Sequence, residues 1–186
     1  PTFISAVKTL QPRLFLFENV RGMLYRNKKY LDEILLTLRN LGYEVEVKLL
    51  NAVDFGVPQN RERLIVVGHR SKFEFPEPLR RRVTAGEALG SLATEYDDDS
   101  KWLTSSMDKY IQRYEDKSAC INPRDLHLDR PARTLTCRNL AGATGDMHRI
   151  RLPDGRRRRL TTKEAARLQS FPDSFHFAGN ETSVYN

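Results

Sequence analysis

The chain has 186 residues, 39% of them hydrophobic and 30% charged, which indicates a folded protein with a polar surface, built as one domain or two small lobes. Two cysteines are too few for a disulfide framework, and no apolar run approaches the roughly 20 residues of a membrane span, so we expect a cytoplasmic or otherwise intracellular protein with no membrane contact. The formal net charge of +7 favours a polyanionic partner, although a basic surface without a specific partner is the alternative.

The first part of the chain predicts helices and strands in alternation. Hydrophobic residues recur at helical spacing in two segments, and alternate or run continuously in three others. A short continuous apolar run predicts a strand buried on both faces, as in a parallel sheet. The expected elements are helices over 2–10 and 30–41 and strands over 14–17, 43–50 and 63–68. This order is typical of the end of an α/β sheet whose opening strands are missing.

The pattern changes near Ser71, where prolines and an arginine cluster follow. Thr84 and Glu87 resemble a capping box that opens a short helix. Residues 93–129 give only short signals, and 130–149 are irregular and rich in glycine. A second capped helix begins near Thr161 and ends before Pro172, so we expect a small irregular lobe followed by one clear helix.

Two segments carry side chains suited to chemistry. In Phe17-Glu18-Asn19-Val20, a carboxylate stands at the C-terminal end of a strand, where open α/β sheets bind ligands; the alternative is a helix cap or a solvated turn residue. In Gln59-Asn60-Arg61-Glu62-Arg63, a loop leads Arg61 and Arg63 onto one face of a strand. The alternative for these arginines is an edge strand protected by charge.

Together and in this order, four segments resemble the DNA (cytosine-5) methyltransferase family. Residues 17–20 resemble its Glu-Asn-Val motif, and residues 59–63 are similar to its Gln-x-Arg-x-Arg motif. Asp129-Arg130-Pro131-Ala132-Arg133-Thr134-Leu135-Thr136-Cys137-Arg138 resembles the Thr-Leu core of the target recognition region, and residues 159–175 resemble the helix that follows it. The four segments extend over nearly the whole chain.

The resemblance implies an α/β fold, namely the C-terminal part of a Rossmann-like methyltransferase sheet with a small irregular target recognition lobe. It implies three parts: the C-terminal half of the catalytic domain in residues 1–70, the target recognition region in 71–158, and a helix returning to the catalytic domain in 159–186.

The resemblance also implies a reaction, the transfer of methyl from S-adenosylmethionine to C5 of a cytosine flipped out of duplex DNA. Glu18 would meet the N3 and 4-amino edge of the base, and Arg63 would hold O2, where negative charge develops. Arg61 would orient the nucleophile loop or a phosphate, while Asn19 and Gln59 would have supporting roles, Asn19 by locking the turn at Glu18.

Two features of the family are missing from the sequence, the Pro-Cys nucleophile loop and the Phe-x-Gly-x-Gly cofactor loop. Cys120 and Cys137 lie in the expected recognition region and are poor candidates for the nucleophile. We therefore expect a C-terminal portion that is inactive alone. A missing N-terminal half, on the same chain or a separate subunit, would bind most of the S-adenosylmethionine.

The expected recognition region supplies the contacts to double-stranded DNA. Arginine pairing with guanine is the commonest specific base contact, and glycines at 142 and 145 would allow close backbone approach. The run Arg156-Arg157-Arg158-Arg159 would bind phosphates, with a solvated hairpin tip as its alternative. The residues assigned to DNA are Arg133, Thr134, Leu135, Arg138, Arg156 and Arg157.

Two other functions remain open. An RNA-directed member of the family is one, and the long recognition lobe argues against it. A non-catalytic DNA-binding subunit of a split methyltransferase is the other, and Glu18 and Arg63 argue against it because DNA binding alone requires neither.

Overall fold

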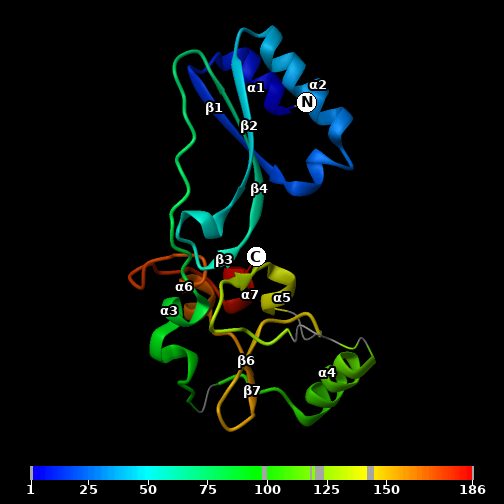
Figure 1. Cartoon of the computed structure of the whole chain (residues 1–186), viewed down its shortest axis with the longest axis vertical. Helices are drawn as coiled ribbons and strands as arrows, with labels where there is room; N and C mark the ends of the chain where they lie inside the picture. The colour runs from blue at the N-terminus through cyan, green and yellow to red at the C-terminus, as the bar shows by residue number, and fades with distance from the viewer. Residues whose placement is uncertain (1, 98–99, 118, 120–123, 142–144, 186) are drawn as a thin grey trace. The chain divides into compact units, whose positions relative to one another are not determined.

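A computed structural model describes residues 2–97, 100–117, 119, 124–141 and 145–185 of the chain (Figure 1). The chain divides into two compact units. Unit 1 comprises Pro1–Phe55 and Arg61–Arg80, and unit 2 comprises Gly56–Asn60 and Arg81–Asn186. Unit 2 thus contains residues 81–158 of the expected recognition region, the helix that follows and a short piece of the Gln-x-Arg-x-Arg segment, while residues 71–80 belong to unit 1.

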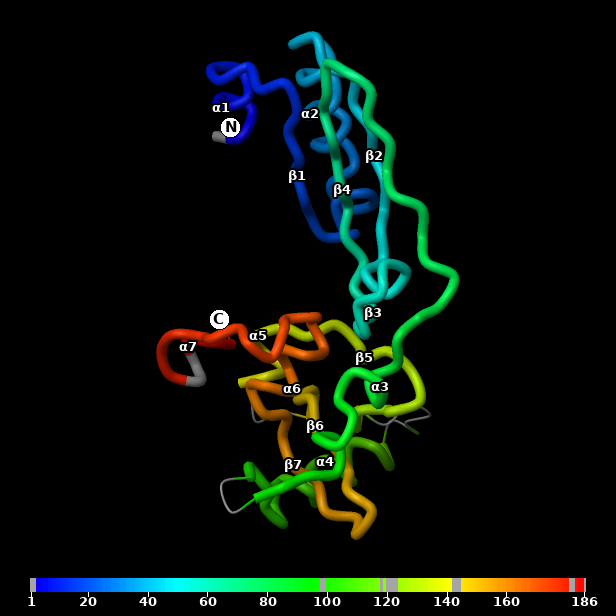
Figure 2. Tube along the Cα trace, turned by 90° about the vertical axis from the view of Figure 1, so that its left-hand side faces the viewer, coloured from blue at the N-terminus to red at the C-terminus, as the bar shows by residue number. Residues whose placement is uncertain are grey.

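Unit 1 is built on a three-stranded sheet. Figure 2 shows its strands side by side in the order β1, β4, β2. The strands are β1 (Leu14–Val20), β2 (Glu44–Asn51) and β4 (Glu62–His69), with helices α1 (Thr2–Leu10) and α2 (Lys28–Asn40) and the 3-10 turns η1 (Arg21–Leu24) and η2 (Ala52–Phe55). β4 runs antiparallel to both neighbours. The expectation of parallel pairing for β1 is therefore wrong: β1 and β2 share a direction, but β4 lies between them.

The helices cover one face of this sheet. Phe15, Phe17, Leu64 and Val66 point to that face and pack with the apolar residues of α1 and α2. The other face carries Glu18, and β1 is not buried there, because Leu16 on that face is 58% exposed. The prediction of a strand buried on both faces is wrong for this reason.

A close aromatic contact lies near one end of the sheet. Phe15 lies opposite Gly68 in the β1–β4 register, and a Cβ atom built on Gly68 would overlap the Phe15 ring. The Phe15 ring also meets Tyr43 edge-on with 5.0 Å between the ring centroids, and the Tyr43 hydroxyl donates to Pro12 O over 2.7 Å. Residue 68 must therefore lack a side chain for this ring to pack on the backbone.

Unit 2 consists of short elements joined by long connections. Thr84 and Thr161 each form a capping box, with Glu87 and Glu164 respectively, so both expected helix starts are confirmed. The elements are β3 (Gln59–Asn60), α3 (Ala85–Leu89), η3 (Gly90–Ala93), α4 (Ser105–Lys117), β5 (Ala132–Arg133), α5 (Cys137–Ala141), β6 (Arg149–Arg151), β7 (Arg157–Arg159), α6 (Thr162–Arg167) and α7 (Glu181–Tyr185). β3 pairs with β5 in parallel, and β6 pairs with β7 in antiparallel fashion.

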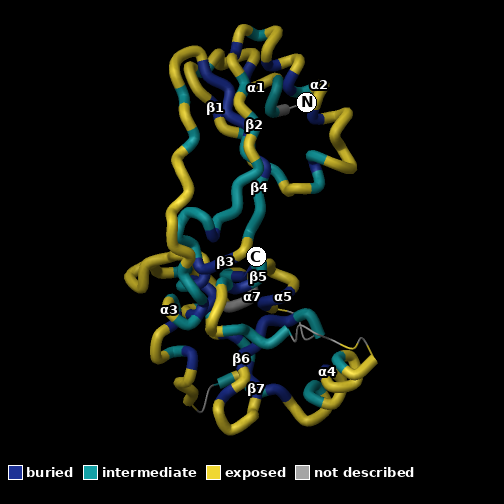
Figure 3. Tube along the Cα trace, viewed as in Figure 1, coloured by how far each residue is buried: buried dark blue, intermediate teal, exposed yellow. Residues whose placement is uncertain are grey.

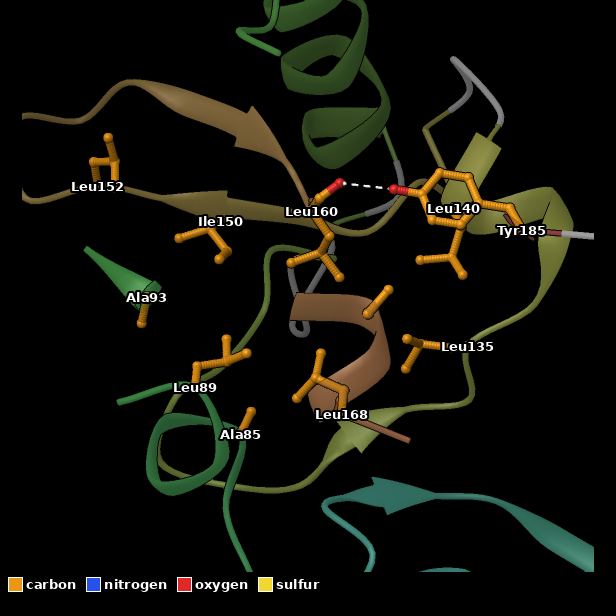
Figure 4. Packing of buried hydrophobic residues seen from close by; sticks show 12 residues of the cluster. Ala85, Leu89, Ala93, Leu135, Leu140, Ile150, Leu152, Leu160, Leu168 and Tyr185 are labelled. Atoms are coloured by element: carbon orange, nitrogen blue, oxygen red, sulfur yellow. Dashed lines mark hydrogen bonds between the residues drawn. The ribbon is translucent and has the colours of Figure 1, made fainter. Parts of the chain in front are cut away.

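One apolar core holds unit 2 together, and the buried segments converge on it (Figure 3). It gathers Leu89, Leu135, Ile150 and Leu168 from four separate segments (Figure 4). Tyr185 closes one side, and its hydroxyl donates to the Leu160 carbonyl over 3.3 Å. In the part of the chain that is described, no helix is long and apolar enough to cross a membrane.

Candidate active site and DNA-facing residues

Glu18 and Arg63 form an ion pair on the sheet face opposite the helices. Glu18 lies opposite Ile65 and Arg63 lies opposite Val20, so the two residues are diagonal neighbours on one face. Arg63 Nε is 2.6 Å from Glu18 Oε1, and Arg63 Nη1 also donates to Glu62 O over 2.8 Å. The side chains are 22% exposed for Arg63 and 48% exposed for Glu18, so both are accessible from solvent. The structure thus brings together the two residues expected to hold the base.

Arg61 lies in the same electrostatic neighbourhood. Partial burial lowers the pKa of Arg61, the Arg63 charge lowers it further, and the Glu18 carboxylate opposes both effects. The Arg61 backbone N–H donates to Asn51 Oδ1 over 2.9 Å, which fixes the chain just before β4. Two guanidinium groups and one carboxylate therefore share this region, and their net positive charge suits a group that becomes electron-rich.

Asn19 does not lock a turn at Glu18, because β1 continues through Val20. Its side-chain Oδ1 accepts a hydrogen bond from Val20 N over 2.8 Å. The bond braces the end of the strand, directly before η1 begins at Arg21. Asn19 therefore has a local structural role next to Glu18.

Gln59 belongs to unit 2 and is buried there. It is 1% exposed, its Oε1 accepts from Leu135 N over 3.1 Å, and its Nε2 donates to Leu168 O over 3.4 Å. The two ends of the amide thus hold two backbone segments of the unit 2 core. The Gln-x-Arg-x-Arg segment is divided, since Gln59 belongs to unit 2 while Arg61 and Arg63 belong to unit 1.

Most side chains of the Thr-Leu segment contact other parts of unit 2. Leu135 is 2% exposed in the core, so the prediction that it contacts DNA is wrong: an apolar side chain here gains more from burial. Thr134 Oγ1 donates to Asn60 O over 2.7 Å and extends the β3–β5 pairing. Arg133 donates to Asp146 Oδ1 over 3.0 Å, and Arg138 is exposed on α5 with no ion pair among the described residues.

The arginine run at 156–159 is not a uniform solvent-facing row. The side chains of Arg157 and Arg158 are 7% and 2% exposed and are paired with carboxylates, Arg158 with Glu164 over 2.7 Å. The assignment of Arg157 to DNA is therefore wrong for this structure, because its guanidinium is occupied by Asp125 and Asp108. Arg156 is exposed, and it stacks 4.1 Å from the centroid of the Trp102 ring.

Sequence reasoning missed a cavity of about 490 Å³ beside β5. Its lining lies wholly within unit 2 and comes from 124–133, Asn60 and His148. Burial and then the Arg133 charge lower the pKa of His148 to about 4, so this ring is neutral at pH 7. One feature of the sequence could have indicated this cavity, namely that Arg124, His127 and Arg130 lie close together in the segment before β5.

The described residues do not fit a metal or a nucleotide cofactor. Among them, no three His, Cys, Asp or Glu side chains group closely enough to hold a metal ion. The sequence contains no Gly-x-Gly pair for a phosphate or ribose loop, and the Glu18 carboxylate is already bonded to Arg63. Cys137 is exposed on α5 of unit 2, whereas Cys120 and Gly142 lie outside the described residues.

Unit 1 thus carries a carboxylate–guanidinium pair on its sheet, and unit 2 has an apolar core of its own. The family model of C-5 cytosine-specific DNA methylase matches residues 1–186, and the chain belongs to this family, as its motifs predicted. Type II methyltransferase M.AplI of Arthrospira platensis is 55% identical over 188 residues, covering 100% of this chain and 54% of the relative. M.BsuRI of Bacillus subtilis is 33% identical over 202 residues, covering 99% of this chain and 46% of the relative.

Solved methyltransferase structures share the fold. A Spodoptera frugiperda DNMT2 mutant has a TM-score of 0.68 at 15% identity, covering 98% of this chain and 64% of that one. A putative DNA modification methyltransferase from an E. coli prophage has a TM-score of 0.58 at 22% identity, covering 94% and 64%. The fold is therefore part of a Rossmann-like methyltransferase fold, as expected. The chain spans about half the length of the curated relatives it matches.

Proposed function

We propose that this chain carries the base-holding and DNA-recognising part of a DNA (cytosine-5) methyltransferase. The complete protein would methylate C5 of a cytosine flipped out of duplex DNA, with S-adenosylmethionine as the methyl donor. The observation that carries the proposal is the Glu18–Arg63 pair, with 2.6 Å between Nε and Oε1 on an accessible sheet face.

The chemistry of cytosine matches this pair. One polar edge of the ring offers N3 and the 4-amino group, and the neighbouring position offers the O2 acceptor. A carboxyl group can hydrogen-bond to the N3 and 4-amino edge. A guanidinium can donate to O2, because arginine stays charged and presents its donors in a fixed plane. When a base enters, the contact between Glu18 and Arg63 would be exchanged for contacts to the ring.

The charges around the pair would also lower the barrier to reaction. As a nucleophile adds to the ring, negative charge develops at O2 and N3. Preorganised donors aimed at such charge are usually a large contribution to catalysis. Arg63 would donate at O2, while Arg61 adds a second positive charge to the same neighbourhood. Flipping a base costs a few kcal/mol, which these contacts would help to offset.

We propose that the nucleophilic cysteine and the cofactor loop lie outside this chain. The sequence has no Pro-Cys pair and no Gly-x-Gly pair, and Cys137 belongs to unit 2 rather than to the unit that carries Glu18. The chain alone would therefore show no turnover. Arg138 and Arg156, both exposed, are proposed contacts to DNA.

The test is methyl transfer by the full-length gene product that carries this sequence. Labelled S-adenosylmethionine is supplied with duplex DNA or folded RNA, and methylated positions are mapped by bisulfite sequencing. We expect C5 methylation of cytosine in duplex DNA, reduced about 10²–10³-fold by Glu18→Gln or Arg63→Lys, in the range for loss of one donor to a developing charge. Glu46→Gln is the matched control, since Glu46 is exposed on the same sheet face. Methylation of RNA alone, or equal activity of Glu18→Gln and Glu46→Gln, would refute the proposal.

A further inference from the structure

We propose that the cavity beside β5, here called the arginine cavity, binds a backbone phosphate of duplex DNA. The arginine cavity is defined by Arg124, His127, Arg130, Arg133 and His148. This inference rests on the proposed function and assigns part of its DNA contact to a cavity that joins Arg130 and Arg133 of the Thr-Leu segment to Arg124, His127 and His148.

The arginine cavity is large enough for an oxygen-rich ligand group. Its volume of about 490 Å³ falls in the usual range of roughly 300–1,000 Å³ for ligand pockets. The lining segment leads directly into β5, which Gln59 and Asn60 hold through the parallel β3–β5 pairing. The walls are therefore fixed to the core of unit 2 rather than to an isolated loop.

Guanidinium groups outnumber the carboxylates that neutralise them at this cavity. Arg124 and Arg133 share one carboxylate, that of Asp146. Arg130 has the Asp129 carboxylate at 3.8 Å, too long for a hydrogen bond. Asp125, the acid among the described lining residues, pairs with Arg149 over 2.5 Å, with Arg151 over 2.8 Å and with Arg157 over 3.2 Å.

The titration of the lining residues reflects the same excess of positive charge. Burial lowers the pKa of Arg133 to about 10, and the charges of Arg124 and Arg149 contribute to the decrease. The Arg133 charge likewise helps keep His148 neutral. Arg133 Nε and His148 Nδ1 are both buried without a hydrogen-bond partner in the described part of the chain. An anion bound nearby would relieve this unbalanced positive field.

A phosphate fits the arginine cavity better than a base edge. The Arg130 side chain is the most exposed of the three lining arginines at 51%, and the side chains of Arg124 and Arg133 are each 36% exposed. A neighbouring side chain contacts the guanidinium of Arg130 and that of Arg124. Arg130 Nη2 lies 3.0 Å from His127 Nδ1, and Arg124 Nη2 donates to the Tyr114 hydroxyl over 3.1 Å. Guanidinium forks bind phosphate oxygens in bidentate fashion, and a neutral base edge would leave the charge excess in place.

The experiment measures the salt dependence of DNA binding by the full-length gene product. Fluorescence anisotropy gives Kd at several salt concentrations for the duplex that the protein methylates and for three duplexes of unrelated sequence. Loss of one phosphate contact should lower the slope of log K against log salt by about 0.9 in magnitude. We expect this decrease in slope for the Arg130→Gln variant and for the double variant Arg124→Gln/Arg130→Gln. The decrease should be the same on every duplex. Arg130→Lys keeps the charge and should keep the slope.

Arg113→Gln is the control, because Arg113 is an exposed arginine of α4 outside the cavity lining. Thermal melting of each variant checks the fold. An unchanged slope for the double variant would overturn the phosphate site, and a loss on one duplex sequence only would show that the cavity meets a base edge. A third outcome separates the two proposals. If the variants lose slope as expected but the wild-type protein methylates no duplex, the proposed function is refuted and the phosphate site is supported.

Discussion

Gln59 Oε1 accepts a hydrogen bond from the Leu135 N–H over 3.1 Å, which joins the start of the Gln-x-Arg-x-Arg segment to the Thr-Leu segment of unit 2. The catalytic arginines proposed here, Arg61 and Arg63, follow within four residues of Gln59 but belong to unit 1. The hydrogen bonds of Gln59 therefore hold unit 2 together, whereas the two arginines of the same motif belong to the sheet of unit 1.

Gln59→Ala should destabilise unit 2. The substitution leaves the Leu135 N–H buried without an acceptor, which costs about 1–3 kcal/mol, and opens a cavity at a site only 1% exposed. Urea denaturation of the chain measures the change. Gln112→Ala is the control, since Gln112 is exposed on α4 and bonds only to Asp116 among the described residues. Equal unfolding free energies for the two variants would contradict a structural role for Gln59.

Gly68→Ala should destabilise unit 1. A Cβ atom at this position would overlap the Phe15 ring, so the ring or the strand must move, and such overpacking typically costs about 1–3 kcal/mol. Denaturation of Gly68→Ala, of Phe15→Leu and of the double variant forms a cycle. The contact predicts that Gly68→Ala costs less when residue 15 is Leu. Additive losses would show that the two residues do not interact.

The chain should be less stable in acid, because His148 is buried as a neutral ring. The folded-state pKa of His148 is about 4, below its ordinary value of 6.5, so the unfolded chain binds more protons between these values. The His148 contribution is complete above pH 6.5 and is lost as the pH falls toward 4, by about 3 kcal/mol in all.

The measurement is the unfolding free energy from denaturant titrations between pH 4 and pH 7. His148→Phe should show a weaker pH dependence than the wild type over this window. His176→Ala, which changes an exposed histidine, should retain the wild-type slope. If His148→Phe kept that slope as well, burial of a neutral His148 would not be its source.

Arg138→Ala should relax base preference at one position of the DNA target. Arg138 is exposed on α5, and a good bidentate contact from arginine to guanine contributes about 1–3 kcal/mol of discrimination. Methylation of a duplex library randomised around the target cytosine measures the preference. A uniform loss on all sequences would mean that Arg138 contacts the backbone instead of a base.

Much of the local structure could be predicted from sequence, because it depends on near neighbours. The apolar spacing of α2 and the Thr161–Glu164 capping box both lie within one short segment. Helix α4 was missed because it is polar, with Ile111 as its one residue classed as buried. Met107, Tyr110, Ile111 and Tyr114 nevertheless recur at helical spacing in α4, a short period that was overlooked.

The errors in the site arise from partners far away in sequence. Arg157 looked like a phosphate ligand because Asp125, its partner, lies 32 residues earlier. Leu135 looked like part of a DNA-reading loop, and only the assembled core shows that it is buried. The Glu18–Arg63 pairing came from the family resemblance, since nothing local places residues 45 positions apart diagonally on one sheet face.

The most direct test of the central claim is a crystal structure of the full-length gene product bound to a duplex containing its target cytosine. In the structure described here, Arg63 Nε and Glu18 Oε1 are 2.6 Å apart. We predict that this contact opens, with Glu18 at the N3 and 4-amino edge of an everted cytosine and Arg63 at O2. A pair that stays closed while the flipped base is held by other side chains would contradict the account.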